Sequence, residues 1–284
     1  MKRVRSNVKT CTYDTSYMYM TDFSFHANRA AHMGDLPRLR ELFAHGIPRT
    51  GSVHDVCFHA VTTGHLECLE YAHDIGCPWG ALTTATAAAY GHLDCLEYAH
   101  EHGCPWDTET PEQAAFGGSL ECLAYAHEHG CPWDADTAAW AARSGSLDCL
   151  AYAHEHGCPW TWWTTAMAAK HGHLACLEYM HDRGCSWDES TTAQAASGGH
   201  LHCLAYAHEN GCPWDAYTSG LARRFAHMDC MQYAYERGCP GAHDTSGGRR
   251  HAAASAIGRF YKLWRSVRDA DLRLALAGRR LSRF

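Results

Sequence analysis

The sequence predicts an all-α solenoid, in which about eight helix-turn-helix repeats stack on one another. Two observations carry this prediction. A pair of cysteines recurs at a fixed step along most of the chain, and each copy shows the same order of threonine, paired alanines and glycine. One helix pair of this size cannot bury its own apolar surface, so the copies must stack to form a core.

The repeat is defined by its cysteines, and consecutive members of each series are 27 residues apart, as in 95 − 68. The first series is Cys68, Cys95, Cys122, Cys149, Cys176, Cys203 and Cys230. The second is Cys77, Cys104, Cys131, Cys158, Cys185, Cys212 and Cys239. A less regular copy around Gly34 precedes them, and the residues after Thr245 are predicted to be either a degraded ninth copy or a cap.

The first helix of each repeat follows a recurring threonine. Thr110 and Gln113 are three residues apart, as are Thr191 and Gln194, which predicts a capping box at the helix start. A pair of alanines then allows neighbouring helices to approach closely. Gly118 and its equivalents are placed to end this helix as C′ glycines.

The second helix is predicted over residues 120–129. Apolar residues cover most of its girth, and only Glu121, Ala124 and Glu128 are expected to face outward, which is typical of a helix packed on several sides. Gly130 ends it, and the following Cys-Pro-Trp turns the chain, because proline cannot continue a helix. The recurring tryptophan of this turn is expected to be framework.

On the residues "AAFGGSLECLAYAHEHGC" (114–131) the unit resembles an ankyrin repeat, whose consensus runs Ala-Ala-x-x-Gly-His-Leu before an apolar helix. The ankyrin unit has about 33 residues, and the residues missing here fall where ankyrins carry their β-hairpin finger. The short form "GHLECLEYAHDIGCPW" is similar to arrays of large DNA viruses that infect amoebae. The resemblance implies an ankyrin-like α-solenoid lacking the long fingers, without catalytic residues, that binds proteins (host proteins if the chain is viral).

The ankyrin-like array is predicted to cover residues 27–241, after a separate N-terminal segment, 1–26. Some ankyrin families join their array to an F-box. Residues 1–26 show no F-box pattern, so a substrate-recruiting adaptor for ubiquitin ligation ranks below the scaffold, as the alternative function. Residues 242–284 are predicted to form basic capping helices or a degenerate ninth repeat, with Ile257, Phe260, Trp264 and Val267 at helical spacing. A nuclear-import signal, a nucleic-acid contact or a membrane-surface helix are the alternatives for this segment.

Composition limits the class of protein. Hydrophobic residues make up 46% of the chain, enough for a core, and the net charge of −7 argues against a polyanion-binding body. No apolar run approaches the roughly 18 residues of a membrane span, and the N-terminus lacks the apolar region of a signal peptide. We therefore expect an intracellular, cytoplasmic monomer, with the nucleus as an alternative through the basic C-terminus.

Cysteine and histidine invite a metal interpretation. Cys122, His127 and Cys131 form a C-x4-H-x3-C cluster in each repeat, and a metal-binding Cys/His repeat protein is a further alternative. A five-residue step turns a helix by about 140°, so Cys122 and His127 do not share a face. Equivalent cysteines of stacked helices lie about 8–10 Å apart, too far for a disulfide. The sequence therefore favours buried cysteines with no metal and no cofactor, and a histidine column of half-exposed residues at helix ends.

An enzyme is not expected. A catalytic site breaks symmetry, whereas almost every polar residue outside the variable positions is copied along the array. The usual phosphate-binding, nucleophile and zinc-protease motifs are missing from the sequence. We therefore expect neither catalytic residues nor a small-molecule substrate.

The partner surface is predicted at positions that depart from the repeat. The third and sixth residues after the opening threonine vary most, and in an ankyrin-like array the first helix and the loop before it line the concave face. Aromatic and basic residues gather there in two adjacent repeats, a composition typical of binding hot spots. The predicted partner-binding residues are Trp140, Arg143, Trp162, Trp163, Met167 and Lys170. The alternative is that Trp162 or Trp163 packs on a neighbouring turn.

Overall fold

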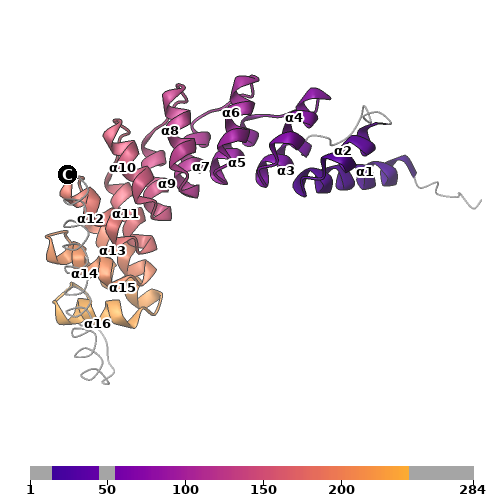
Figure 1. Ribbon diagram of the computed structural model, residues 1–284. Coiled ribbons are helices and arrows are strands. Elements are labelled where there is room, and N and C mark those ends of the chain that lie inside the picture. The colour runs from indigo at the N-terminus through magenta and orange to yellow at the C-terminus, as the bar shows by residue number, and fades with distance from the viewer. Residues whose placement is uncertain (1–14, 45–54, 243–284) are drawn as a thin grey trace, which may run out of the picture. The chain divides into compact units, whose positions relative to one another are not determined.

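The computed structural model describes residues 15–44 and 55–242, and these ranges contain sixteen α-helices and no strand (Figure 1). The helices follow one another as eight pairs. This confirms the prediction of an all-α fold of eight helix-turn-helix repeats without long β-hairpin fingers. The helices are α1 (Thr15–His32), α2 (Leu36–Phe43), α3 (Val56–Thr62), α4 (Leu66–Asp74), α5 (Ala81–Ala89), α6 (Leu93–Glu101), α7 (Glu109–Gly117), α8 (Leu120–Glu128), α9 (Ala135–Ser144), α10 (Leu147–Glu155), α11 (Trp162–His171), α12 (Leu174–Asp182), α13 (Glu189–Gly198), α14 (Leu201–Glu209), α15 (Ala216–Arg224) and α16 (Met228–Glu236).

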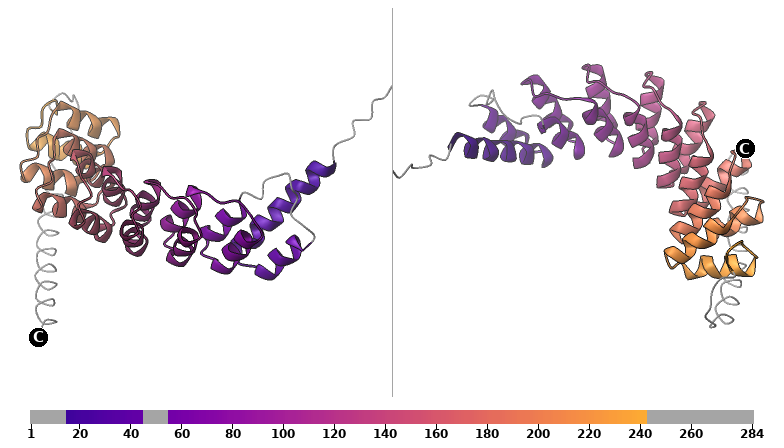
Figure 2. Two further views of the ribbon diagram at one scale, coloured as in Figure 1. Left: turned by 90° about the horizontal axis from the view of Figure 1, so that it is seen from above. Right: turned by 180° about the vertical axis from the view of Figure 1, so that it is seen from behind.

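The chain divides into two compact units, residues 1–132 and 133–284. In the first unit, the odd-numbered helices α1 to α7 pack side by side, and the even-numbered helices α2 to α8 form a second row. The second unit repeats this arrangement with α9 to α15 in one row and α10 to α16 in the other. Figure 2 shows the helix pairs of each unit from two further directions.

The two predicted domain boundaries, at residues 27 and 242, lie near the first and the last of the described helices. The boundary at residue 27 lies inside α1, which begins at Thr15. The predicted C-terminal segment, 242–284, lies outside the described residues except for Ala242, as do residues 1–14 of the predicted N-terminal segment. The cap and the ninth repeat therefore stay predictions.

The first helix of each repeat begins earlier than the sequence predicts. In α13 the N-cap is Asp188, whose carboxylate accepts a hydrogen bond from the Ser190 backbone N–H at 2.9 Å. Thr191 is a fully buried residue of the first turn, and its hydroxyl lies 3.1 Å from that of Thr165. The capping boxes predicted at Thr110 and Thr191 are wrong, because both threonines lie inside their helices. The threonine joins neighbouring repeats, and in α9, α11, α13 and α15 the cap comes from the residue directly after the Cys-x-Trp turn.

Helix α5 lacks such a cap. Gly80 is the N-cap of α5 in extended backbone, and a Cβ added there would meet no atom within 4 Å. We expect Gly80→Asp to stabilise the first unit by about 0.5 to 1 kcal/mol, since it adds a capping carboxylate and restricts the unfolded chain. Urea unfolding followed by circular dichroism measures this. Gly80→Ala is the control, and an equal gain from it would show that the carboxylate contributes nothing.

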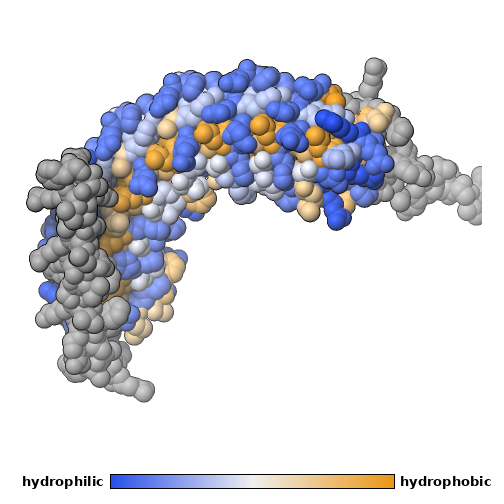
Figure 3. All heavy atoms as spheres, in the orientation of Figure 1, coloured by the Kyte–Doolittle hydropathy of each residue, from blue (hydrophilic) through white to orange (hydrophobic). Residues whose placement is uncertain are grey.

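The second helices supply the largest core side chains. One leucine in each second helix from α4 to α14 is fully buried: Leu69, Leu96 and Leu123 in the first unit, and Leu150, Leu177 and Leu204 in the second. Glu121 and Glu128 are exposed as predicted, and Ala124 is half-buried. In the first unit, hydrophilic residues cover the upper edge of α4, α6 and α8 in Figure 3, above a band of apolar residues.

Histidine, tryptophan and tyrosine link one repeat to the next. The ring of His73 stacks on that of Trp79 at 4.0 Å between centroids, and its Nδ1 lies 3.0 Å from the hydroxyl oxygen of Tyr98 in the next repeat. In the second unit His181 contacts Trp187 and Tyr206 in the same way. The prediction that the recurring tryptophan is framework is confirmed, and the histidine column is part of the same framework.

The cysteines are buried thiols, and none of those in the described ranges forms a disulfide. In the second series the Sγ–H donates to a backbone carbonyl of the preceding repeat, as from Cys158 to Asp134 O at 3.1 Å. Burial raises the pKa of the Cys104 and Cys131 thiols to about 12. Zinc binds the thiolate, so neutral thiols held by carbonyls favour a structural role over the metal-binding alternative.

Candidate functional site

Two neighbouring first helices of the second unit enclose a groove of about 240 Å³. Helix α9 contributes Asp136, Ala139, Trp140 and Arg143, and α11 contributes Trp163 and Met167. Positions 136, 140 and 143 share one face of a helix at spacings of four and three residues, as do 163, 167 and 170 of α11. The two sets are one repeat apart, so the stacking of repeats brings variable positions of both helices to one groove.

The groove has an apolar floor and aromatic walls. Met167 is 7% exposed and lies at the bottom, whereas Trp163 keeps 40% of its surface exposed. The guanidinium carbon of Arg143 lies 4.6 Å from the centroid of the Trp140 ring, a cation–π contact that holds both side chains along the groove. Four of the six predicted partner-binding residues therefore lie together: Trp140, Arg143, Trp163 and Met167.

The other two predicted residues border this groove without lining it. Trp162 is 46% exposed, and its ring meets that of Trp163 edge to face at 5.8 Å. Lys170 is half-buried at the end of α11, beside His171. Burial lowers the pKa of His171, and the positive charges of Arg143 and Lys170 lower it further, which shows that these cations lie near one another.

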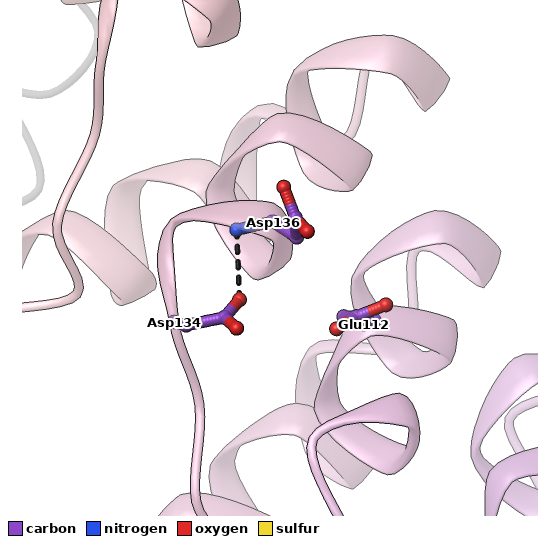
Figure 4. A group of neighbouring side chains, drawn as sticks. All are labelled: Glu112, Asp134 and Asp136. Carbon is purple, nitrogen blue, oxygen red and sulfur yellow. Dashed lines mark hydrogen bonds between the residues drawn. The ribbon is translucent and has the colours of Figure 1, made fainter.

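Asp136 is a groove residue that the sequence analysis missed. It lies four residues before Trp140 and 27 before Trp163 (163 − 136), so its place in the repeat was the signal that could have found it. Figure 4 shows how the first turn of α9 is held: the Asp134 carboxylate accepts a hydrogen bond from the Asp136 backbone N–H at 2.9 Å. The Asp136 side chain adds a carboxylate to a groove whose other charged group is the Arg143 guanidinium.

The groove contains no arrangement of nucleophile, base and orienting group. Its only titratable side chains are one carboxylate and one guanidinium. In the part of the chain that the structure describes, cysteines and histidines do not gather into groups of three or more potential metal ligands. Among the same residues, no helix is both long and apolar enough to cross a membrane.

A solved structure of the human ASB11 ankyrin repeat domain is similar to this chain. The match has a TM-score of 0.49 and 18% sequence identity, and it covers 56% of this chain and 84% of that domain. A likeness of this size does not transfer the binding properties of that domain to this chain. No family model matches the sequence, and no curated protein matches it.

Proposed function

We propose that this chain is a non-catalytic scaffold that binds a partner protein through the groove between α9 and α11. The observation that carries the proposal is Trp163, which keeps 40% of its surface exposed at the wall of a groove of about 240 Å³. A large aromatic side chain beside an apolar pocket is typical of a binding hot spot. Apolar surface left open on a folded protein marks an interaction site.

The tryptophans of the groove differ from the framework tryptophans. Trp187 and its equivalents stack on a histidine of their own repeat. Trp140 stands where other first helices carry Thr86, Gln113 or Gln194, and Trp163 stands where they carry Glu109 or Ser190. Because these helices fold and stack without a tryptophan at these positions, packing alone does not require one.

The same scaffold is proposed to work inside a cell, in a reducing compartment. All of the described cysteines are free thiols, and most are fully buried. Proteins of oxidising compartments usually use cysteine in disulfides. A scaffold whose cysteines are reduced fits the cytoplasm or the nucleus. Fractionation of cells that make the chain distinguishes the two compartments.

Replacing Trp163 tests the groove. We expect Trp163→Ala to weaken partner binding by about 2 kcal/mol, roughly 30-fold, because it removes the aromatic wall that a partner side chain would bury. The thermal midpoint should change little. The measurement is affinity for a partner captured from the native cell, with melting followed by circular dichroism.

Tyr217→Ala is the matched control, because Tyr217 is an exposed aromatic residue at the same repeat position of α15 and lies outside the groove. It should leave both binding and melting unchanged. A large fall in melting temperature for Trp163→Ala with full binding would show that the ring packs for stability and would refute the groove as the partner site.

A further inference from the structure

The groove ends at a surface that we call the cationic surface: Arg143 and Lys170 supply its positive charges, and the imidazoles of His171, His200 and His202 lie beside them. The Arg143 side chain lines one end of the groove, and Asp136 lies seven residues earlier on the same helix face. Seven residues of helix correspond to about 10 Å. A ligand that follows the groove therefore passes from a carboxylate, over an apolar centre, to cations.

Contacts between side chains and loops make this surface continuous within the second unit. His202 Nε2 donates to the Gly172 carbonyl at 2.9 Å, which places this side chain at the end of α11, next to His171. The rings of His200 and His202 are 5.8 Å apart. His173 Nε2 donates to the Arg143 carbonyl at 2.9 Å and so connects the same loop to the end of α9.

Arg143 and Lys170 carry the lasting positive charges of this surface, because burial and neighbouring positive groups lower the pKa of His171 and His200 and so favour their neutral forms. Burial lowers the pKa of His200, and His202, His171, His173 and His227 lower it further. Burial, then Arg143, Lys170 and His173, lower the pKa of His171. At the repeat position of His202, the other second helices from α4 to α16 carry an acidic residue: Glu67, Asp94, Glu121, Asp148 or Asp229. Helices α12 and α14 carry Ala175 and His202 instead.

We propose that the partner segment bound by this chain is acidic next to its apolar anchor: an apolar side chain enters the groove between Trp140 and Trp163, and neighbouring carboxylates lie over the cationic surface. This rests on the proposed function and names the chemistry of the partner. A peptide fits better than a nucleic acid, because Asp136 would repel a continuous phosphate backbone, whereas a peptide can carry a neutral or basic residue at that end.

The test is selection of random dodecapeptides, displayed on phage, against the full chain. We expect the selected peptides to combine an aromatic or aliphatic residue with neighbouring Asp or Glu. Replacing those acidic residues by Gln or Asn in a synthetic copy should weaken binding at least about tenfold at low salt, and much less at high salt, where exposed charges are screened.

Two pairs of substitutions separate local charge from net charge. Ala175→Glu with His202→Asp places acidic residues on the cationic surface, as other second helices carry them. Gly80→Asp with Ala124→Glu adds the same two negative charges in the first unit, at positions where other repeats carry Asp or Glu. The first pair should abolish the enrichment of acidic residues, and the second should leave it intact. Circular dichroism checks that both variants are folded.

The outcomes distinguish this inference from the proposed function. Trp163→Ala should remove the apolar preference and keep the acidic one, and the failure of Trp163→Ala alone would count against the groove. Selected peptides without acidic residues, or equal effects of the two charge pairs, would overturn the inference. Tighter binding of a single-stranded oligonucleotide, lost in the Ala175→Glu and His202→Asp variant, would overturn it in favour of nucleic acid.

Discussion

Raising the pH above about 9 is expected to unfold this protein cooperatively, because its buried thiols cannot ionise in the folded state. In ten cysteines burial raises the thiol pKa from 9.0 to about 11 or about 12. They are Cys57, Cys77, Cys95, Cys104, Cys131, Cys158, Cys176, Cys185, Cys212 and Cys230. Each is at most 6% exposed.

The direction follows from proton linkage. Above pH 9 the unfolded chain releases thiol protons that the folded chain keeps, so the free energy of unfolding falls as the pH rises. Each such thiol contributes about 1.4 kcal/mol per pH unit between the two pKa values. Ten of them would contribute about 14 kcal/mol per pH unit, comparable with the whole stability of a typical domain. This stabilising effect is fully present below pH 9 and is lost above it.

A pH titration under reducing conditions, followed by far-ultraviolet circular dichroism, measures this transition. We expect helix content to collapse within about one to two pH units above 9. Replacing Cys158, Cys185 and Cys212 by alanine is the control, because three fewer thiols should make the fall in unfolding free energy with pH shallower by about 4 kcal/mol per pH unit. Helix content that persists at about pH 12 would show that these thiols ionise without unfolding.

Gly199→Ala is expected to destabilise the second unit by about 3 kcal/mol. Gly199 ends α13 with a φ of 76°, and a Cβ there would lie 2.5 Å from Nδ1 of His227. The His227 Nε2 donates to the Ser197 carbonyl at 2.9 Å. The substitution therefore combines backbone strain with displacement of an inter-repeat ring.

Gly184→Ala is the matched control, because Gly184 has the same φ of 76° but no atom within 4 Å of an added Cβ. It should cost only the left-handed backbone strain, about 1 to 2 kcal/mol. His227→Ser should rescue Gly199→Ala, since Ser119 and Ser146 occupy this repeat position in other second helices. Urea unfolding of the three single variants and of the Gly199→Ala, His227→Ser double variant measures the differences in stability. Equal losses for the two glycines would contradict a role for the His227 contact.

The sequence by itself determined the repeat architecture. The 27-residue cysteine series, the paired alanines and the glycines that end each helix predicted eight helix pairs, and the structure has eight pairs in the described residues. The prediction of the repeats succeeded because every repeat packs against its neighbours through the same positions. Comparing the repeats within one sequence therefore shows which residues the packing requires. Helix breaks at left-handed glycines such as Gly118 and Gly145 are local backbone effects and need no tertiary information.

Tertiary structure decided what the recurring polar residues do. The threonine series looked like helix caps, yet Thr165 and Thr191 meet across the interface between repeats. The sequence favoured buried cysteines without metal but did not show which groups the cysteines and histidines contact: His181 stacks on Trp187, and Cys158 donates to a carbonyl of the preceding repeat. Their partners lie about one repeat away along the chain, and spacing within a repeat cannot show which groups a neighbouring repeat presents.

The candidate site shows the same division. Trp140, Trp163 and Met167 could be identified from the sequence alone, because their residue types differ from those at the same position in the other repeats. That Asp136 shares their groove, and that Lys170 and Trp162 only border it, depended on how α9 and α11 lie against each other. A groove is a property of the space between two helices, and that space exists only after the repeats have stacked.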